Sequence, residues 1–345
     1  MNTFDLLRKT SGFVLLLWFA GASSSNAKTF KLATIAPGFL EWMQQLRTST
    51  KQIEQITDGR IKFRIYPGGA MGDDVTVLRK IRIGQLHGGV LAAGSLTRFF
   101  PDLQIYNLPL TFKSYEEVDY IRKHMDQGIV DGLQVGGMVS FHLTETGFAY
   151  LLSKEPVKSV EDVRKLKAWI PDGDPIAAEL IKTFGVSPIP LSIPDVLPGL
   201  QTGIINAVAV PPVVALALQW HNHVDYMLDL PLIYVYSMLA LDSKSLTGVS
   251  EEDFLLLKAS LDKVFSEVDS SNRQDNRDAF QALTSQGIKV IKPDEKDLPA
   301  WEVIAKKSIE DLVRSGEISA EIVGIFQNHL IQYRNEDRAD ETSAE

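Results

Sequence analysis

Strand and helix patterns alternate along the first part of the chain, and this alternation restricts the fold more than any other sequence feature. Residues 30–36 and 61–66 alternate apolar and polar side chains and are rich in β-branched residues, which is typical of strands. Residues 41–57 and 75–83 have helical spacing, and residues 88–91 are a short apolar strand candidate. Strands that alternate with helices form right-handed βαβ units, so the pattern predicts a mostly parallel sheet.

A second α/β unit begins after about residue 140, which predicts two lobes in a chain of 345 residues. The join near residues 140–146 lacks the composition of a flexible linker. We therefore expect the chain to cross between the lobes rather than to run through a tether. The elements expected in this unit are strands at 148–152, 167–170 and 207–210 and helices at 175–184 and 193–202.

The longest helical pattern begins at Ser250 and reaches a C-cap candidate at Gly287. Ser250 and Asp253 resemble a capping box with Asp in place of Glu. The polar stretch Ser270–Asn272 could bend or break the helix. A continuous helix of this length is longer than one lobe, so we expect it to bridge both.

The N-terminus carries the pattern of a secretory signal. Arg8 and Lys9 precede an apolar stretch at residues 11–22, which is too short to span about 30 Å of hydrocarbon. Small residues follow at Ser25–Ala27, where a signal peptidase would read them. We predict cleavage before Lys28 and a periplasmic protein, with an uncleaved anchor or a buried helix as the alternative.

Composition excludes several classes of partner and chemistry. The formal charge of −9, without a run of Lys and Arg, argues against a nucleic-acid partner. The absence of cysteine excludes disulfides, thiolate chemistry and a lipid anchor on an N-terminal cysteine.

Motifs that carry catalytic chemistry are missing from the sequence. There is no Gly-x-Ser-x-Gly elbow, Walker A loop, Gly-x-Gly-x-x-Gly fingerprint or His-Glu-x-x-His motif. Asp73–Asp74 and Glu116–Glu117 are adjacent carboxylates, which we interpret as partners of helix dipoles. His221 and His223 form the only close histidine pair, and two visible ligands are a weak metal signal. We therefore predict that the chain is not an enzyme and has no cofactor and no metal site.

Short motifs in both halves of the chain have a family-specific order and spacing. They are Asp58–Lys62, Tyr66–Gly72, Ile83–Leu86, Phe100–Leu103, Leu108–Leu110, Thr146–Phe148, Ser159–Asp162, Leu166–Lys167 and Leu200–Gly203. Together they resemble the DctP-type solute-binding receptors of tripartite ATP-independent periplasmic (TRAP) transporters. The resemblance covers roughly residues 30–335.

The resemblance implies an α/β periplasmic binding protein of two lobes, with mixed and parallel sheets, crossover strands and a long helix bridging both lobes. Such receptors close around a small-molecule ligand and deliver it to the subunits of a membrane permease driven by an ion gradient. The expected boundaries are a signal peptide at 1–27, lobe I at 28–145 plus about 235–270, lobe II at 146–234 plus about 271–335, and a disordered tail at 336–345.

Three departures from the family pattern concern the ligand. The strand after Leu166–Lys167 usually carries an arginine that pairs with a ligand carboxylate, and this sequence has Trp169 there. A second arginine often follows the Gly-Phe pair, where this sequence has Ala149. A polar segment usually follows Gln-Thr-Gly, where this sequence has the mostly apolar residues 206–211.

These departures predict a ligand that is apolar, aromatic or otherwise not a simple carboxylate, because burying an anion without a partner is costly. Trp169 could stack on a ring or face a cation. The alternative is that Trp169 fills a degenerate cleft and the scaffold serves as a periplasmic interaction protein. The expected ligand contacts are Trp169, Ala149, Val210, Pro211, Phe39, Trp42, Ala92 and Tyr236.

Overall fold

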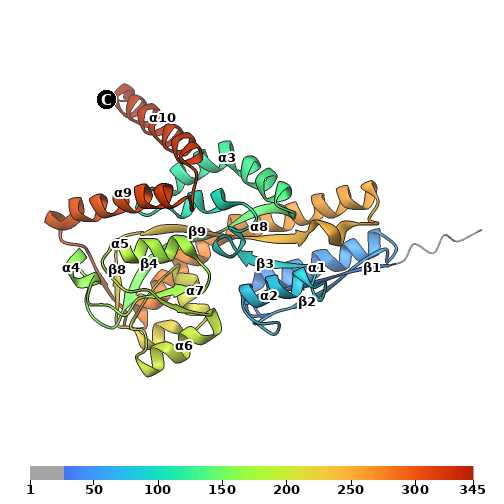
Figure 1. Ribbon diagram of the computed structural model, residues 1–345, viewed down its shortest axis with the longest axis horizontal. Coiled ribbons are helices and arrows are strands. Elements are labelled where there is room, and N and C mark those ends of the chain that lie inside the picture. Colours follow the sequence, from blue (N-terminus) through green and yellow to red (C-terminus); the bar gives the residue numbers. More distant parts are fainter. Residues whose placement is uncertain (1–26, 345) are drawn as a thin grey trace, which may run out of the picture.

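A computed structural model describes residues 27–344 of the chain (Figure 1). The predicted signal peptide, apart from its last residue, lies outside this range. The strands are β1 (Lys28–Ala33), β2 (Ile61–Tyr66), β3 (Gly88–Ala92), β4 (Met138–Ser153), β5 (Trp169–Pro171), β6 (Ile189–Leu191), β7 (Ala207–Val210), β8 (Tyr226–Leu228), β9 (Ile233–Asp242) and β10 (Lys289–Ile291).

Ten α-helices are described in the same range. They are α1 (Glu41–Ile56), α2 (Asp74–Arg82), α3 (Tyr115–Val135), α4 (Val160–Val163), α5 (Pro175–Thr183), α6 (Ile193–Thr202), α7 (Pro212–Ala217), α8 (Glu251–Ser285), α9 (Leu298–Ser315) and α10 (Ala320–Ala344). Short 3₁₀ turns include η1 (Ala93–Leu96), η2 (Pro101–Asn107) and η3 (Trp220–His223). Among the helices described, none is long and apolar enough to cross a membrane.

The main sheet has eight strands and mixes parallel with antiparallel pairs. Seven strands follow the order β10-β8-β4-β9-β3-β1-β2, and β7 also pairs with β4. β1 pairs in parallel with both β2 and β3, as the predicted βαβ units require. β3 and β4 pair with β9 in antiparallel fashion, while β5 and β6 form a separate parallel pair. The predicted α/β class with mixed and parallel sheets is confirmed.

Two long strands carry the chain from one lobe to the other. The sequence predicted a strand only at 148–152, whereas β4 extends over Met138–Ser153. It pairs with β9 from Met138 opposite Asp242 to Ala149 opposite Ile233, and then with β7 and β8. The β4–β9 register shifts twice, at Ser140/Leu143 and at Glu145/Gly147. These interruptions hid the first half of β4 from a search for regular alternation.

The long helix α8 is continuous and bridges both lobes, as predicted. It runs through Ser270–Asn272 without a break, so the polar stretch does not end it. Its N-terminal half packs against α1 and its C-terminal half lies beside α7 (Figure 1). Ser250 caps the helix by accepting a hydrogen bond from the Asp253 backbone N–H at 3.1 Å. The predicted capping box is wrong in one respect, because the Asp253 carboxylate instead pairs with Arg60.

Apolar side chains fill both faces of the sheet in lobe I. Phe30 of β1 packs with Leu46 of α1 and Leu261 of α8 on one face. On the other face, residues such as Leu91 and Ile121 join η2, α3 and the start of α10 in a second cluster. A sheet whose parallel strands are covered on both faces explains why these strands are rich in apolar residues.

The C-terminal helices return to different lobes. Trp301 of α9 lies 5.5 Å from Phe184 beside α5, within the core of lobe II. Phe326 of α10 lies 5.3 Å from Phe112, and α10 packs against α3 and η2 in lobe I (Figure 1). The predicted boundary put all of 271–335 in lobe II, because composition does not reveal which surface an apolar stripe covers. We propose that lobe I includes α10, which continues to Ala344 where composition predicted a disordered tail.

Candidate functional site

The candidate ligand site is the edge at which loops from the two lobes meet. Gly69 follows β2 and lies against Pro194 of α6, with 3.8 Å between an ideal Cβ position on Gly69 and Pro194 Cγ. Gly173 follows β5 and lies against Val75 of α2, with 3.3 Å between the corresponding Cβ position and Val75 Cγ2. Open α/β sheets bind ligands outside the carboxyl ends of their strands, which is where these contacts occur.

The third contact between the lobes joins Gly94 and Gln104 to Asp174. A Cβ atom on Gly94 would overlap the Asp174 carboxylate and lie 2.8 Å from Gln104 Nε2. Gln104 donates from Nε2 to both Asp174 oxygens at 3.1 Å, and its own side chain is only 1% exposed. Glycine at position 94 therefore allows a close approach of the two lobes at this contact.

Asp174 occupies this contact without a charged partner among the described residues. It caps α5 by accepting a hydrogen bond from the Ala177 backbone N–H at 3.0 Å, and its other donor is the neutral amide of Gln104. Burial raises the pKa of Asp174 above its ordinary value, because the charged form loses water without gaining a cation.

Asp74 is a second carboxylate at the same edge, on the lobe I side. Asp73 is the N-cap of α2 and accepts a hydrogen bond from the Thr76 backbone N–H at 2.8 Å, as expected for a dipole partner. Asp74 instead accepts one from the Ala92 backbone N–H at 3.0 Å. Its Oδ1 atom is buried and has no hydrogen-bond partner in the described part of the chain. Burial raises the pKa of Asp74 to about 6.

Trp169 lies inside lobe II rather than on an open surface. Its side chain is 6% exposed, and its indole Nε1 donates to the Leu191 carbonyl oxygen at 2.9 Å. The ring meets Trp220 edge to face at 5.2 Å, and Val210 belongs to the same buried cluster. The indole N–H therefore links β5 to β6, and the ring contributes to the core.

The other predicted contacts lie in different parts of the structure. Ala149 has no exposed surface and Tyr236 is 1% exposed, with its ring 5.3 Å from that of Tyr106 in the core of lobe I. Trp42 packs against the cluster formed by β1, α1 and α8. The remaining three differ in exposure: Pro211 is buried, Ala92 is partly buried, and Phe39 is 75% exposed just before α1.

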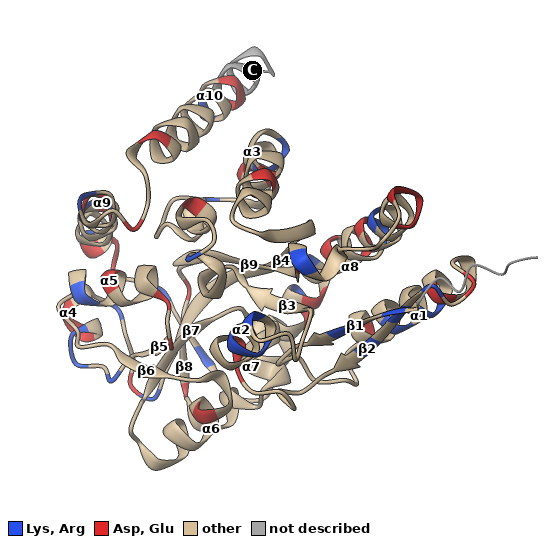
Figure 2. Cartoon of the chain, turned by 45° about the vertical axis from the view of Figure 1, so that its right-hand side comes forward, with Lys and Arg blue, Asp and Glu red and all other residues tan. Residues whose placement is uncertain are grey.

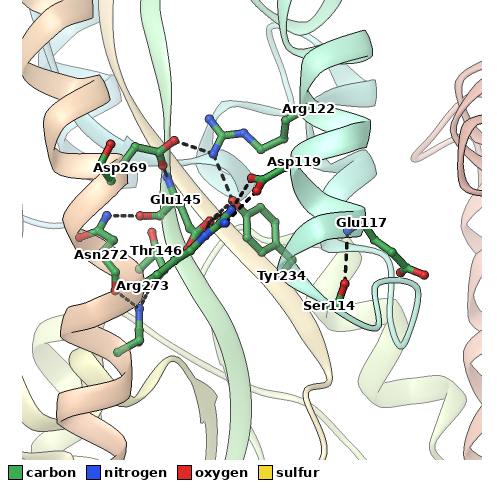
Figure 3. A network of polar contacts seen from close by, with 12 residues as sticks. Ser114, Glu117, Asp119, Arg122, Glu145, Thr146, Tyr234, Asp269, Asn272 and Arg273 are labelled. Atoms are coloured by element: carbon green, nitrogen blue, oxygen red, sulfur yellow. Dashed lines mark hydrogen bonds and ion pairs between the residues drawn. The ribbon is translucent and has the colours of Figure 1, made fainter. Parts of the chain in front are cut away.

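A polar network holds the crossover of β4, β9 and α8, beside α3 (Figure 3). Glu145 of β4 is 1% exposed and accepts hydrogen bonds from Tyr234 Oη at 3.0 Å and from Arg273 Nε at 3.0 and 3.2 Å. Arg273 also pairs with Asp119 of α3, at 2.9 Å from Nη1. Burial raises the pKa of Glu145, and Arg273 opposes that rise.

The same network continues one helical turn away (Figure 3). Asp269 of α8 accepts hydrogen bonds from Arg122 Nη1 at 2.8 Å and from the Glu145 backbone N–H at 2.5 Å. Asn276 of α8 donates to the Thr146 carbonyl oxygen at 2.8 Å. These contacts fix α8 to the irregular stretch of β4, where the chain passes between the lobes.

Two cavities are described within residues 27–344, and the smaller one is lined by Phe148, Tyr150 and Pro212, the chain neighbours of Ala149 and Pro211. One, of about 480 Å³, lies between α3, β4 and α8 and includes His142 and Lys258. The other, of about 240 Å³, lies beside α7 and α8 and includes Tyr115 and Phe280. Neither is lined by any residue predicted to contact ligand. No cluster of three or more possible metal-binding side chains occurs in residues 27–344.

Sequence reasoning did not single out Asp174, Gln104 or Gly94. Asp174 precedes Pro175 at the start of a predicted helix, so it reads as an ordinary N-cap. Asp74 was interpreted together with Asp73 as a dipole partner, and it lies in the first turn of α2, but its hydrogen bond from Ala92 was not predicted. Only the approach of the two lobes distinguishes these residues from others of the same type.

Two lobes joined by crossover strands and a bridging helix, with loops meeting at strand ends, define a solute-binding receptor. A family model described as bacterial extracellular solute-binding protein, family 7 (DctP), matches residues 36–315. The chain belongs to this family, whose members are the solute-binding receptors of TRAP transporters.

Relatives and solved structures agree with this assignment. The sialic acid-binding periplasmic protein SiaP of Vibrio cholerae is 22% identical over 286 residues, which cover 81% of this chain and 88% of SiaP. A TRAP periplasmic solute-binding protein of Desulfovibrio salexigens with bound orotic acid has a TM-score of 0.80 at 17% identity, covering 88% of this chain and 99% of that one. The sugar acid-binding protein of Advenella mimigardefordensis with galactonate has a TM-score of 0.81 at 15% identity, covering 89% and 98%.

Proposed function

We propose that this receptor captures a small organic ligand that is not a simple carboxylate, with an apolar or aromatic body, and delivers it to an ion-gradient-driven permease. The observation that carries the proposal is the replacement of both expected arginines. Trp169 and Ala149 occupy those positions, and both are buried, Trp169 within an apolar cluster of lobe II.

The charges at the meeting edge support the same conclusion. Asp74 and Asp174 lie there, and their hydrogen bonds within residues 27–344 come from neutral donors. A ligand carboxylate placed beside them would lose its hydration and meet like charge, which costs several kcal/mol. An apolar ligand instead gains about 25 cal/mol for each Å² of apolar surface that it buries.

The similar structures with orotic acid, galactonate or D-glucuronate contain acidic ligands, whereas this chain lacks the two arginines of the family pattern. Their identity to this chain is 15–19%, so the likeness carries the fold rather than the ligand. The proposal therefore concerns a receptor whose ligand class differs from that of these neighbours.

A second candidate is a periplasmic interaction protein on the same scaffold, without a small ligand. The observation in its favour is that neither described cavity is lined by a predicted ligand contact. The two candidates differ in one measurable property, namely whether a small molecule stabilises the folded protein.

Export is part of the proposal. β1 begins at Lys28, the residue after the predicted cleavage site. We expect N-terminal sequencing of the protein recovered from the periplasm to begin at Lys28. A start at Met1 would favour the uncleaved anchor.

The test is a thermal-shift screen of the full chain against uncharged aromatic compounds and against D-glucuronate and galactonate. A ligand that binds only the folded state adds about 2.7 kcal/mol of stability at a hundredfold excess over its Kd. Stabilisation by at least one uncharged compound and by neither sugar acid supports the proposal. Stabilisation by the sugar acids contradicts it, and no stabilisation at all favours the interaction protein.

A variant of Gly94 links any stabilisation to closure of the lobes. Gly94→Ala places a Cβ atom against Asp174 and Gln104, so we expect it to weaken the ligand-dependent shift. Gly128→Ala is the matched control, because that glycine lies inside α3 with no atom within 4 Å of its Cβ position. An equal ligand shift in both variants would place the ligand elsewhere.

A further inference from the structure

Two carboxylates from opposite lobes converge on one short segment at the meeting edge. Asp74 of lobe I accepts a hydrogen bond from the Ala92 backbone N–H, directly before η1. Asp174 of lobe II packs against Gly94, inside η1. Residues 92–94 therefore lie between an acidic group of each lobe.

Hydrogen-bond acceptors outnumber donors at this place. Asp74 Oδ1 and Gln104 Oε1 are both buried atoms without a partner among the residues described. Gln104 is 1% exposed and already donates its amide to Asp174. Most buried polar atoms in proteins have a partner, so the orphaned Gln104 Oε1 beside the uncompensated Asp174 carboxylate and the orphaned Asp74 Oδ1 of lobe I each indicate a missing donor.

Two cations lie near this edge but pair with neither aspartate: Lys80 donates from Nζ to the Met71 carbonyl oxygen at 2.9 Å, and Arg47 lies beside the loop after β1. Figure 2 shows Lys and Arg interspersed with Asp and Glu along α8 and α9. Buried carboxylates at the crossover, such as Glu145, have arginine partners there. The ion pairs formed within residues 27–344 include neither Asp74 nor Asp174.

We propose that Asp74 and Asp174 form a subsite for an organic cation, an ammonium or amidinium group carried by the ligand. The inference rests on the proposed function and names the ligand's polar end. Such a group supplies several N–H donors and a positive charge, and hydrogen bonds between charged partners are stronger than neutral ones.

The arrangement also couples binding to closure. Asp74 belongs to lobe I and Asp174 to lobe II, so a cation that contacts both aspartates does so only when the lobes are together. A ligand shifts a conformational equilibrium by its difference in affinity for the two states. The cation therefore favours the closed arrangement, whereas the two like charges without it oppose closure.

A metal ion fits the subsite less well than an organic cation. Ca²⁺ takes 6–8 oxygen ligands and Mg²⁺ requires octahedral geometry. In the described range, no group of three or more carboxylates or histidines surrounds either aspartate. An organic cation needs fewer acceptors, because its remaining surface can be covered by apolar side chains.

The experiment is titration calorimetry of the full-length receptor with nine matched probes. Butyl, cyclohexyl and benzyl skeletons are each used as the ammonium, the alcohol and the carboxylate. We expect an ammonium to bind, and to bind about tenfold or more tightly than its alcohol, with the carboxylate weakest.

Conservative variants connect this preference to the two carboxylates. Asp174→Asn keeps an N-cap residue and an acceptor for Gln104 but removes the charge. We expect it, and Asp74→Asn independently, to weaken ammonium binding about 30-fold or more. Asp172→Asn, exposed two residues away, and Asp73→Asn, the neighbouring cap, are matched controls that leave binding unchanged.

The outcomes separate this inference from the proposed function. Alcohols that bind as tightly as ammonium compounds, or binding that both Asp→Asn variants retain, overturn the cation subsite and leave the proposed function standing. Carboxylates that bind tightest, or nine probes without binding, count against both. Stabilisation by calcium chloride alone that Asp174→Asn abolishes would identify a metal site and overturn the organic cation.

Discussion

Removing Arg273 would expose how the crossover of the two lobes is stabilised. Its guanidinium pairs with Glu145, whose side chain is 1% exposed, and with Asp119, whose side chain is 60% exposed. In Arg273→Met the aliphatic part of the side chain remains, while Glu145 keeps only the hydrogen bond from Tyr234. The substitution therefore leaves the buried Glu145 carboxylate without a cationic partner and does not open a large cavity.

The expected cost follows from the burial of the two partners. The exposed Asp119 pair contributes about 0–1 kcal/mol. Breaking a buried pair by removing one partner costs about 3–5 kcal/mol, and protonation of the stranded carboxylate limits the loss to the lower end. The guanidinium also lies 4.4 Å from the centre of the Tyr115 ring, which adds about 0.5–1 kcal/mol. We expect Arg273→Met to lower the free energy of unfolding by about 3.5–5 kcal/mol in total.

A double-mutant cycle measured by urea unfolding checks this reasoning. Glu145→Gln removes the buried charge, so Arg273→Met/Glu145→Gln should be more stable than Arg273→Met alone by about 1–2 kcal/mol. Burial already raises the pKa of Glu145, and losing Arg273 raises it further. A carboxyl with a raised folded-state pKa costs stability above that pKa and is relieved as the pH falls, so the defect should be smaller at pH 5 than at pH 8.

A double variant less stable than Arg273→Met would refute the reasoning. So would a defect in Arg273→Met that grows as the pH falls. Either result would mean that Arg273 acts through packing rather than by compensating Glu145.

Three further predictions concern other parts of the fold. Phe326→Ala removes a fully buried ring of α10 and should cost about 3–5 kcal/mol in urea unfolding, whereas an effect below about 1 kcal/mol would mean that α10 does not dock on lobe I. Gly147→Ala introduces a Cβ at φ +117° against the Asn276 amide and should cost about 1–3 kcal/mol by the same assay; wild-type stability would refute the strain. The Arg60 guanidinium lowers the pKa of Asp253 below its ordinary 3.8, so Asp253→Asn should be less stable than wild type at pH 6. The difference should shrink as the pH falls below 3.8, and a difference that does not depend on pH would contradict this prediction.

Much of the fold could be predicted from the periodicity of apolar residues and from the Gly and Pro residues that end strands and helices. The strand–helix–strand pattern at 30–66 gives the β1–α1–β2 unit, and the uninterrupted apolar stripe after Ser250 gives α8. Local rules succeed here because each element alternates with the period of its own structure. The first half of β4 was not predicted by these rules, because its two register shifts interrupt the alternation before Gly147.

The site was less accessible to sequence reasoning than the fold. Trp169 and Ala149 were found because they replace residues of a recognised pattern, and their burial could not be read from the sequence. Asp174 looks like an N-cap, and it is one. Its second role arises from Gln104 and Gly94, which lie 70 and 80 residues earlier and meet it only when the lobes are folded together.

Binding of D-glucuronate to the full chain, measured by titration calorimetry at neutral pH, tests the central claim most directly. We expect no measurable heat of binding, because Trp169 and Ala149 replace the expected arginines and two aspartates lie at the meeting edge. Binding with a Kd in the micromolar range or below, about −8 kcal/mol or stronger, would contradict the account. That result would mean that another cationic group compensates the ligand carboxylate.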